Sequence, residues 1–398
     1  MKKKKALVIG GGFAGCAAAH QLELLGDWDV TLLEAAPFLG AGNKTRWYGG
    51  HPYTFGPRHF LTPYEHVYSY LSGILPLRRC QEHEFITYVE PDQQFYAYPI
   101  NMDDVEKMPD YDVIARELKE VEKARLVGEI RALNLEEYWI RSVGKTLYEK
   151  MIKNYNEKMW LVDSNSKIDT FSWSPKGVTL KRGSRAAWDT VYSAYPIALS
   201  GYDDYFPFAT KRANVYLNTR FDFLDVENKT VGIRGERISF DLIVSTIGPD
   251  TLLDYAYGPL EYLGRKLHLM VLPIEHALPQ NVYFVYYANS EEFTRVVEYK
   301  KFTKYDSPDT LLGIEIPVNN GGKDYPMPFQ AQQRMAERYL SELGPMFYSI
   351  GRAGSYLYGI DIDDCINQAM IMAKEIKSGG GDWAVPGLQY RFPEMSRN

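Results

Sequence analysis

Glycines at a fixed spacing open the chain, in the run Gly10-Gly11-Gly12-Phe13-Ala14-Gly15. Gly10 permits a tight turn, Gly12 lets the backbone approach a pyrophosphate, and Gly15 lets a helix pack close to a strand. An apolar run precedes this turn at residues 6–9, small residues at helical spacing follow it, and a second apolar run at 30–33 ends on Glu34. This order predicts a dinucleotide site, with phosphates on the N–H groups of the helix N-terminus and ribose hydroxyls on the Glu34 carboxylate. The alternative is an ordinary tight turn between a strand and a helix, and the motif does not choose between NAD and FAD.

Later segments supply further candidate cofactor contacts. A small-residue turn follows Glu34 and includes Gly42 and Asn43, and an apolar strand at 241–246 leads to Gly248. A glycine-arginine turn, Gly351-Arg352, lies ahead of Asp361 and a predicted helix over 363–376, and it suits a flavin pyrophosphate and ribityl chain. Together with Phe223, in a strand predicted within 215–226, these residues complete the predicted cofactor site.

Composition excludes several function classes. The formal net charge is −6 and 24% of the residues are charged, so no nucleic-acid-binding surface is expected. No apolar stretch of ~18 residues and no signal-peptide pattern occurs, which predicts a soluble, cytoplasmic protein with no membrane partner. The three cysteines are far apart and show no metal spacing, so no metal is expected. The 31 tyrosines would suit a site that binds sugar and phosphate through hydroxyls and flat apolar faces.

Periodicity divides the rest of the chain. Alternating apolar residues predict strands over 84–100, around a Pro91-Asp92 turn, and over 281–318. Between 103 and 160 the period becomes helical, and Asn134 with Glu137 has the spacing of a capping box. Residues 171–189 are rich in chain breakers and cations, which predicts a loop that is either a lid over an anionic ligand or a plain surface loop.

Several of these segments, in the same order, resemble the UDP-galactopyranose mutases, flavoenzymes that interconvert the pyranose and furanose forms of a nucleotide-linked sugar. The most specific patterns are Tyr-x-Glu-Lys-x-Trp at 155–160 and Thr-Arg-x-x-Glu-x-Lys-x-Phe at 294–302. Further matching stretches are 101–102, 134–148, 258–262 and the turn from Gly351 to Asp361. The resemblance covers most of the chain.

This resemblance implies a nucleotide-sugar substrate and an FAD cofactor that is active when reduced, with NAD(P)H as a candidate external reductant. The N5 atom of the reduced flavin would attack the anomeric carbon and displace the nucleotide diphosphate. The sugar ring would then open on the flavin, reclose through another hydroxyl and return to the nucleotide. The cofactor supplies the reactive atom, and cations at the pyrophosphate stabilise the departing charge. A homodimer is usual among bacterial relatives.

Site residues follow from the same resemblance. Arg295 matches the arginine that contacts the pyrophosphate and is the first candidate for a catalytic residue; its alternative role is a surface ion pair. Tyr155 matches the residue that stacks on uracil, with Met151 one helical turn earlier and Trp160 nearby. Other substrate-side matches are tyrosines whose hydroxyls reach the diphosphate and an asparagine near the nucleotide sugar, here Tyr325, Tyr356 and Asn101.

Two departures from the family pattern concern the sugar and flavin side. Bacterial members carry Gly-Ala-His-x-Phe-His-Thr where this chain has residues 56–62, so that Arg58 replaces the first histidine and His59 follows it. Either His59 takes the histidine's role, or Arg58 hydrogen-bonds the flavin. The lid arginine of the family also fails to align, and Arg182 or Arg185 is the candidate replacement. These changes favour retained mutase chemistry on a different sugar or base over loss of activity.

The predicted fold is α/β: a Rossmann-like FAD domain of the glutathione-reductase type, a helical insertion and an antiparallel sheet. The expected domain bounds are 1–50, 205–255 and 340–398 for FAD binding, 101–170 for the helices, and 51–100, 171–204 and 256–339 for the sheet and lid. Two alternatives remain open at this point. One is an FAD amine oxidase or desaturase that uses oxidised flavin, and the other is a non-catalytic binding protein on the same scaffold.

Overall fold

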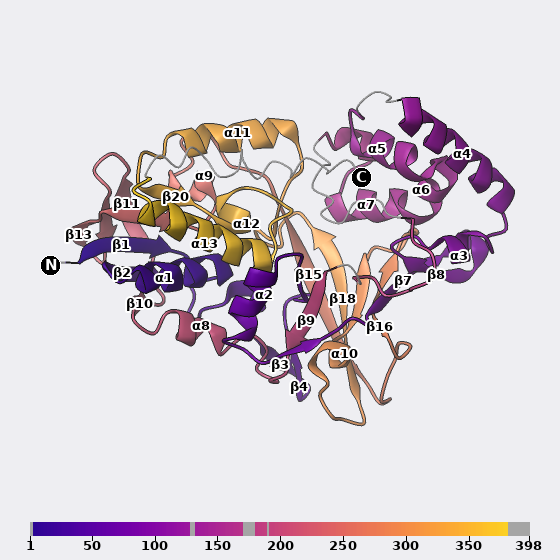
Figure 1. Ribbon diagram of the computed structural model, residues 1–398, viewed down its shortest axis with the longest axis horizontal. Helices are drawn as coiled ribbons and strands as arrows, with labels where there is room; N and C mark the ends of the chain where they lie inside the picture. Colours follow the sequence, from indigo (N-terminus) through magenta and orange to yellow (C-terminus); the bar gives the residue numbers. More distant parts are fainter. Residues whose placement is uncertain (1–2, 128–131, 170–179, 189–190, 381–398) are drawn as a thin grey trace.

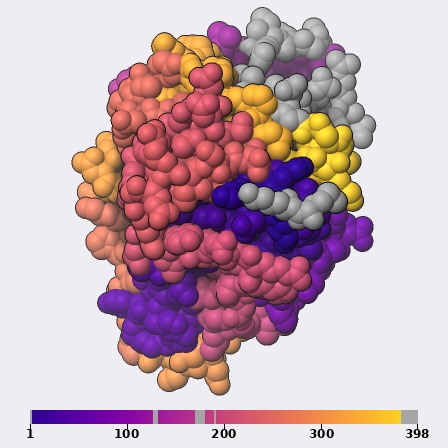
Figure 2. Space-filling model, turned by 90° about the vertical axis from the view of Figure 1, so that its left-hand side faces the viewer, coloured from indigo at the N-terminus to yellow at the C-terminus, as the bar shows by residue number. Residues whose placement is uncertain are grey.

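A parallel sheet is built from three distant parts of the chain in the computed structural model, which describes residues 3–127, 132–169, 180–188 and 191–380. Its strand order is β10-β2-β1-β14-β20, and every neighbouring pair is parallel. The strands are β1 (Lys4–Ile9), β2 (Trp28–Leu33), β10 (Asn214–Tyr216), β14 (Leu242–Ser245) and β20 (Phe347–Ser349). Figure 2 shows the result on one face, where the indigo N-terminal segment lies between pink-red middle segments and yellow C-terminal ones. The predicted Rossmann-like domain is confirmed.

Apolar burial explains why these strands meet. All four residues of β14 are buried, and the last four of β1 are buried as well, as expected for central parallel strands with both faces covered. The helix α1 (Phe13–Leu25) packs against α13 (Ile362–Lys377), and its small residues Ala17, Ala18 and Ala19 are fully buried. The strand predicted at 241–246 and the helix predicted at 363–376 are therefore confirmed to within a residue or two at each end.

A second, seven-stranded sheet lies beside the parallel one in Figure 1. Its order is β19-β15-β18-β17-β16-β7-β8. The strands are β7 (Glu84–Val89), β8 (Gln94–Tyr98), β15 (Tyr262–Leu272), β16 (Val282–Tyr287), β17 (Arg295–Glu298), β18 (Thr310–Val318) and β19 (Tyr325–Pro326). Most pairs are antiparallel as predicted, but β16 and β7 pair in parallel, so the sheet is mixed. The reason is that β7 comes from a remote part of the chain and needs no hairpin to reach β16.

The helical insertion lies away from the parallel sheet (Figure 1), and its core is shared with buried residues of the second sheet such as Leu263 and Tyr325. Its helices are α3 (Met102–Val105), α4 (Tyr111–Val127), α5 (Leu135–Val143), α6 (Lys145–Met151) and α7 (Lys153–Trp160). Asn134 caps α5, because its side chain accepts from the Glu137 N–H at 2.9 Å, but the predicted capping box is only half formed, since the Glu137 carboxylate accepts from the Leu133 N–H at 3.0 Å. Sequence periodicity does not show that the chain breaks at Ile152, between α6 and α7.

Short elements connect these units. They are β3 (Arg46–Tyr48), β4 (His51–Tyr53), β5 (Phe60–Thr62), α2 (Glu65–Ser72), β6 (Leu77–Arg79), β9 (Tyr192–Pro196), α8 (Tyr205–Ala209), β11 (Phe221–Asp225), β12 (Thr230–Ile233), β13 (Glu236–Ser239), α9 (Pro249–Leu252), α10 (Tyr299–Thr303), α11 (Gln330–Ser341) and α12 (Gly351–Gly354), with 3-10 turns at Ala41–Asn43, Glu90–Asp92 and Asn165–Lys167. Among the described residues, no helix is long and apolar enough to cross a membrane, and no cluster of three metal-ligating side chains occurs.

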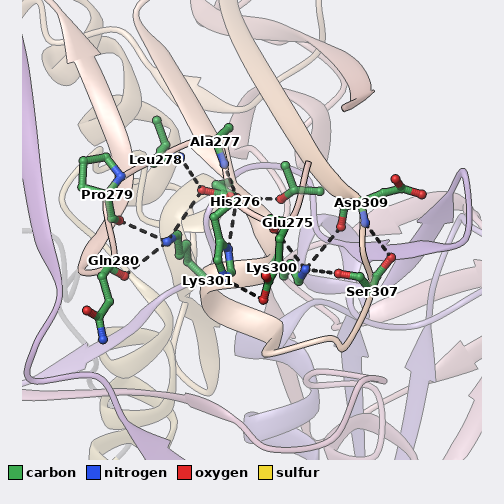
Figure 3. Close-up of polar contacts among 12 residues, drawn as sticks. Glu275, His276, Ala277, Leu278, Pro279, Gln280, Lys300, Lys301, Ser307 and Asp309 are labelled. Atoms are coloured by element: carbon green, nitrogen blue, oxygen red, sulfur yellow. Dashed lines mark hydrogen bonds and ion pairs between the residues drawn. The ribbon is translucent and has the colours of Figure 1, made fainter. Parts of the chain in front are cut away.

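Two buried lysines that follow β17, Lys300 and Lys301, bind the neighbouring loops through hydrogen bonds (Figure 3). The Lys300 ammonium donates to the carbonyl oxygens of Glu275, Ser307 and Asp309, and the Lys301 ammonium donates to those of Pro279 and Gln280. Glu298, which is fully buried, accepts from the backbone N–H groups of Ala277 and Leu278. The Glu-x-Lys part of the 294–302 motif thus holds the backbone that follows Arg295.

Candidate functional site

The glycine turn has the close contacts that its spacing predicts. Gly10 has φ +100, and a Cβ on Gly15 would lie 1.8 Å from the Gly10 carbonyl oxygen, so α1 can approach β1 only with glycine there. The Glu34 carboxylate accepts from the backbone N–H groups of Gly11 and Ala36, both at 2.7 Å. Glu34 is therefore held at the tip of β2 beside the glycine turn, where the sequence places a ribose contact.

Two other predicted cofactor segments meet this turn. The N–H of Gly40 donates to the Gly11 carbonyl at 2.8 Å, which brings the 41–43 turn alongside. The Asn43 Oδ1 atom is buried and has no hydrogen-bond partner within the described ranges. A Cβ on Gly351 would lie 2.8 Å from the Cβ of Ala14, so α12 abuts the first turn of α1. These contacts, with one orphaned acceptor, fit a bound dinucleotide.

Two further predicted cofactor residues, Arg352 and Gly248, contact other residues of the chain. The Arg352 guanidinium pairs with Asp361 at 2.5 Å and donates to the Ile360 carbonyl at 2.8 Å. Gly248 follows β14 and has the Tyr262 hydroxyl and Asp250 packed against it.

Phe223 lies on β11, where its ring covers Gly232 and receives the Arg237 guanidinium at 4.6 Å. Both contacts lie within the three-stranded sheet β11-β12-β13.

An arginine pair shares one carboxylate at the centre of the second sheet. Arg295 on β17 and Glu315 on β18 are cross-strand partners, and their side chains meet at 2.6 Å. Arg265 on β15 reaches the same Glu315 oxygen at 3.1 Å. The side chains of Glu315 and Arg265 are only 2% and 4% exposed, so solvent does not screen this pair. Burial opposes ionisation of Glu315, but the two guanidiniums hold the pKa of its carboxyl below the usual value.

Unused donors remain on both guanidiniums. Nε and Nη2 of Arg265 and Nε of Arg295 are buried and make no hydrogen bond in the part of the chain that the structure describes, although Nε of Arg265 lies 3.6 Å from a carboxylate oxygen of Asp324. Buried polar groups are otherwise almost always paired, so free donors on adjacent cations indicate a place for an anion.

Aromatic rings surround the arginine pair. Arg265 lies 4.7 Å from the Tyr325 ring, and Arg352 lies 5.2 Å from the same ring. Tyr358 packs against Tyr325 at 5.2 Å and against Trp160 at 4.8 Å. Tyr325 thus joins the arginine pair to the Arg352 turn, and Tyr358 extends the cluster to Trp160 on α7.

Tyr155 reaches the cluster from α7. Its ring lies 4.7 Å from that of Tyr286, and the Arg295 guanidinium lies 5.8 Å from the Tyr286 ring. Met151 is buried in the core of the helical insertion, on the other side of the break at Ile152. The predicted single helical turn from Met151 to Tyr155 is wrong, because two separate helices carry them.

Two predicted substrate residues are engaged elsewhere. Tyr356 is fully buried, and its hydroxyl donates to the Glu261 carbonyl at 2.5 Å, away from the arginine pair. Asn101 caps α3, since its side chain accepts from the Asp103 N–H at 2.9 Å. The structure brings Tyr358, rather than Tyr356, to the aromatic cluster.

The candidate lid cations pair with acids outside the cluster. Arg182 contacts Asp103 at 3.3 Å and Glu106 at 2.6 Å, and its side chain is 59% exposed. Arg185 contacts Asp104 at 2.8 Å and Glu84 at 3.4 Å. Neither is placed with Arg295. Residues 170–179 and 189–190 of the predicted lid lie outside the described residues.

Arg58 and His59 point in different directions. The His59 ring nitrogen Nε2 lies 2.8 Å from the Ser193 hydroxyl on β9, and the ring packs on His83 and Phe302. Arg58 instead turns towards the 41–43 turn, where its Nε donates to the Gly42 carbonyl at 3.3 Å. The structure thus places the Arg58 side chain beside the 41–43 turn and the His59 ring against β9.

Sequence reasoning missed Arg265, Glu315, Tyr286 and Tyr358. A signal existed for Glu315, because it is the one acid in the apolar strand 310–318. Tyr286 and Tyr358 had no such signal among 31 tyrosines. The full arrangement is a cationic, aromatic-lined site next to a dinucleotide fingerprint, which can bind an anionic ligand that carries a flat ring.

Comparisons with known proteins place two sequence families within the chain. A sequence model described as UDP-galactopyranose mutase matches residues 150–358, and one described as an NAD(P)-binding Rossmann-like domain matches residues 8–74. The chain is 24% identical to the probable UDP-galactopyranose mutase of Klebsiella pneumoniae over 406 residues, covering 95% of this chain and 96% of that protein.

Solved structures show the same fold. A reduced UDP-galactopyranose mutase matches with a TM-score of 0.79 and 17% identity, over 95% of this chain and 96% of that one. A putative protoporphyrinogen oxidase from Exiguobacterium sp. 255-15 matches with a TM-score of 0.68 and 17% identity, over 95% and 100% of the two chains.

Proposed function

Because the chain belongs to the UDP-galactopyranose mutase family, whose model matches more than half of it, we propose that it interconverts the pyranose and furanose forms of a nucleotide-diphosphate sugar. The proposed substrate is UDP-galactopyranose or a close variant, and the proposed cofactor is FAD in its reduced state. The family is one of isomerases, and the Rossmann-like domain implies a cofactor of the FAD type. By the same resemblance we propose a cytoplasmic homodimer whose product enters polysaccharide synthesis, with NAD(P)H as the external reductant.

The observation that carries this proposal is the pair of guanidiniums with free donors. Arg265 and Arg295 converge on Glu315 from two strands, and Nη2 of Arg265 and Nε of Arg295 are buried without a hydrogen bond among the described residues, while Nε of Arg265 faces Asp324 at 3.6 Å. A diphosphate offers several acceptor oxygens and gains negative charge as it leaves the sugar. Preorganised cations at that position stabilise the leaving group without having to reorganise during the reaction.

The chain's own residues would divide the work as follows. Tyr155 would present an aromatic face to the base, and Trp160 and Tyr358 would line the path from the base to the diphosphate. Arg295, with Arg265 behind it, would bind the diphosphate. The glycine turn with Glu34, Asn43 and Arg352 would hold the FAD, and a bound reduced flavin supplies a nucleophilic nitrogen, N5, for the anomeric carbon.

The test is an isomerisation assay on the purified flavoprotein. Dithionite-reduced protein is incubated with UDP-galactofuranose and a panel of other nucleotide sugars, beside an unreduced control, and the products are separated by chromatography. Conversion that requires reduction supports the proposal and identifies the sugar. No conversion of any sugar would contradict it, and peroxide release from an amine by the oxidised protein would favour an oxidase.

A variant pair sharpens this assay. Arg295→Ala should lower turnover by at least ~10²-fold, the scale expected when a donor to a developing oxyanion is lost. Arg338→Ala is the matched control, because that arginine lies on α11 over the Tyr257 ring, away from the cluster. Near-normal turnover of the Arg295 variant would remove Arg295 from its proposed role.

A further inference from the structure

Four arginines converge near the predicted cofactor side, and three of them have a carboxylate partner. Arg265 and Arg295 share Glu315, and Arg352 pairs with Asp361. The fourth, Arg58, donates from Nε to a backbone carbonyl, and within the described ranges no carboxylate lies within 4.0 Å of it. Among the described residues, Arg58 thus has no carboxylate in ion-pair contact, and Asp324, which faces Arg265, acts on it only from a greater distance.

The position of Arg58 is fixed rather than incidental. Its carbonyl accepts from the buried Tyr202 hydroxyl at 2.7 Å, and the Tyr202 ring packs against Phe13 at 5.3 Å, on the first turn of α1. Its guanidinium lies so close to the 41–43 turn that a Cβ on Gly42 would be 2.6 Å from Nη2. Glycine at position 42 therefore leaves room for this guanidinium beside the turn that contacts the fingerprint.

An unpaired guanidinium in this place is costly. Burial, then the charge of Arg265, lowers the pKa of Arg58 to about 10. Charged groups that are removed from water are ordinarily paired, and a lone one is stabilised when a ligand brings the opposite charge. The geometry indicates that the missing negative charge arrives with a ligand at the junction between the 41–43 turn, Arg352 and Tyr325.

We propose that Arg58 is the counter-ion of the negative charge that the flavin ring carries after reduction. The inference rests on the proposed FAD cofactor and deepens it. Reduction of a neutral flavin by two electrons with uptake of one proton leaves one net negative charge on the ring. A fixed cation beside that charge favours the reduced form over the oxidised form, and so keeps the cofactor in the state that the proposed reaction requires.

The test measures the flavin rather than sugar turnover. The midpoint potential of bound FAD is determined for the wild type, Arg58→Met, Arg58→Lys and the remote control Arg338→Met. Arg58→Met should lower the reduced-to-oxidised ratio at a given potential by at least ~10-fold, which is ~30 mV for a two-electron couple. Arg58→Lys should restore most of the wild-type value because it keeps the charge, and Arg338→Met should match the wild type.

A second measurement serves if Arg58→Met holds FAD weakly. Oxidised and reduced FAD are titrated separately into apoprotein, and the ratio of the two dissociation constants reports the same preference by linkage. A wild-type preference for reduced FAD that Arg58→Met loses supports the proposal. An unchanged potential or ratio would overturn it, and so would equal weakening of both forms, which would assign Arg58 to the cofactor diphosphate.

These outcomes are independent of the sugar. If the isomerisation assay fails while the potential depends on the charge at position 58, the proposed reaction is wrong and the Arg58 inference stands. If isomerisation proceeds and the midpoint potential does not depend on the residue at position 58, the proposed reaction stands and the Arg58 inference is wrong.

Discussion

Replacing Glu315, the carboxylate that Arg265 and Arg295 share, tests most directly whether charge pairing stabilises the site. In Glu315→Gln the side chain keeps its shape and loses its charge, so two guanidiniums that stood 2.6 Å and 3.1 Å from one carboxylate oxygen face each other without it. Two unit charges ~4 Å apart attract each other by ~4 kcal/mol at an effective dielectric of 20, so each of these closer pairs gains at least that much, and the desolvation of Glu315 and the repulsion between the arginines offset part of the total. Breaking buried ion pairs of this kind costs ~3–5 kcal/mol, and we expect a loss near the lower end because glutamine can still accept one hydrogen bond.

The assay is urea unfolding of the wild type and Glu315→Gln, with Glu122→Gln as a control on an exposed helix position. The pKa of Glu315 is lower in the folded protein than its usual 4.5. Its contribution to the free energy of unfolding is therefore fully present above that usual value and is lost as the pH falls through the lower folded value. The difference between wild type and variant should be constant from pH 7 to about 5 and shrink below it.

Added UDP gives a second arm to the same experiment. A diphosphate can replace the missing negative charge, so UDP should stabilise Glu315→Gln more than it stabilises the wild type. A variant within ~1 kcal/mol of the wild type at pH 7, or one that UDP fails to rescue preferentially, would refute the account of the arginine pair.

Three further predictions follow from other contacts. Gly15→Ala should abolish FAD binding, measured by flavin absorbance after gel filtration, because its Cβ would lie 1.8 Å from the Gly10 carbonyl, whereas Gly344→Ala, with open space around it, should bind normally. Burial and two neighbouring carboxylates raise the pKa of Asp363 to about 8, so its ionisation on unfolding destabilises the wild type as the pH rises from about 4 to 8. In urea unfolding, Asp363→Asn should gain up to ~1.4 kcal/mol over the wild type for each pH unit in that range, and a constant difference would contradict this. Lys158→Met should lower turnover by ~10–100-fold, and Lys158→Arg should lower it by less. The reason is that the Lys158 ammonium on α7 donates to two carbonyls, at 2.9 Å and 3.1 Å, and so positions the loop before β17. If a variant loses stability but keeps turnover, this contact serves stability alone.

The fold could be predicted in outline because its signals are local. The glycine spacing, the fully apolar strand at 242–245 and the Asn134 cap each depend on a few neighbouring residues, and each is present in the structure. The parallel pairing of β16 with β7 could not be predicted in this way, because strands that are far apart in the sequence show no periodic pattern that identifies them as partners.

The site was predictable only where a motif carried it. Arg295, Tyr155 and Trp160, which the two specific motifs single out, lie in one cluster, and Tyr325, which has no such motif, lies there as well. Sequence periodicity could not predict how adjacent side chains are oriented. Arg58 and His59 are neighbours in the chain, yet the Arg58 side chain contacts Gly42 and the His59 ring contacts Ser193. Glu315 and Arg265 come together only through the register of β15, β18 and β17, which sequence alone does not specify.

The order of the parallel sheet has a consequence during synthesis. The strand β1 lies at the centre, and its neighbour β14 follows it only after about 230 residues, with β20 another hundred or so further on. At translation rates of ~5–20 residues per second, tens of seconds pass between the synthesis of β1 and β2 and that of β14. During this time the apolar edge of β1 that later pairs with β14 is unpaired. We therefore expect the nascent chain to need a ribosome-associated chaperone until β14 emerges, and chains that stop before β14 to aggregate rather than fold as a partial domain.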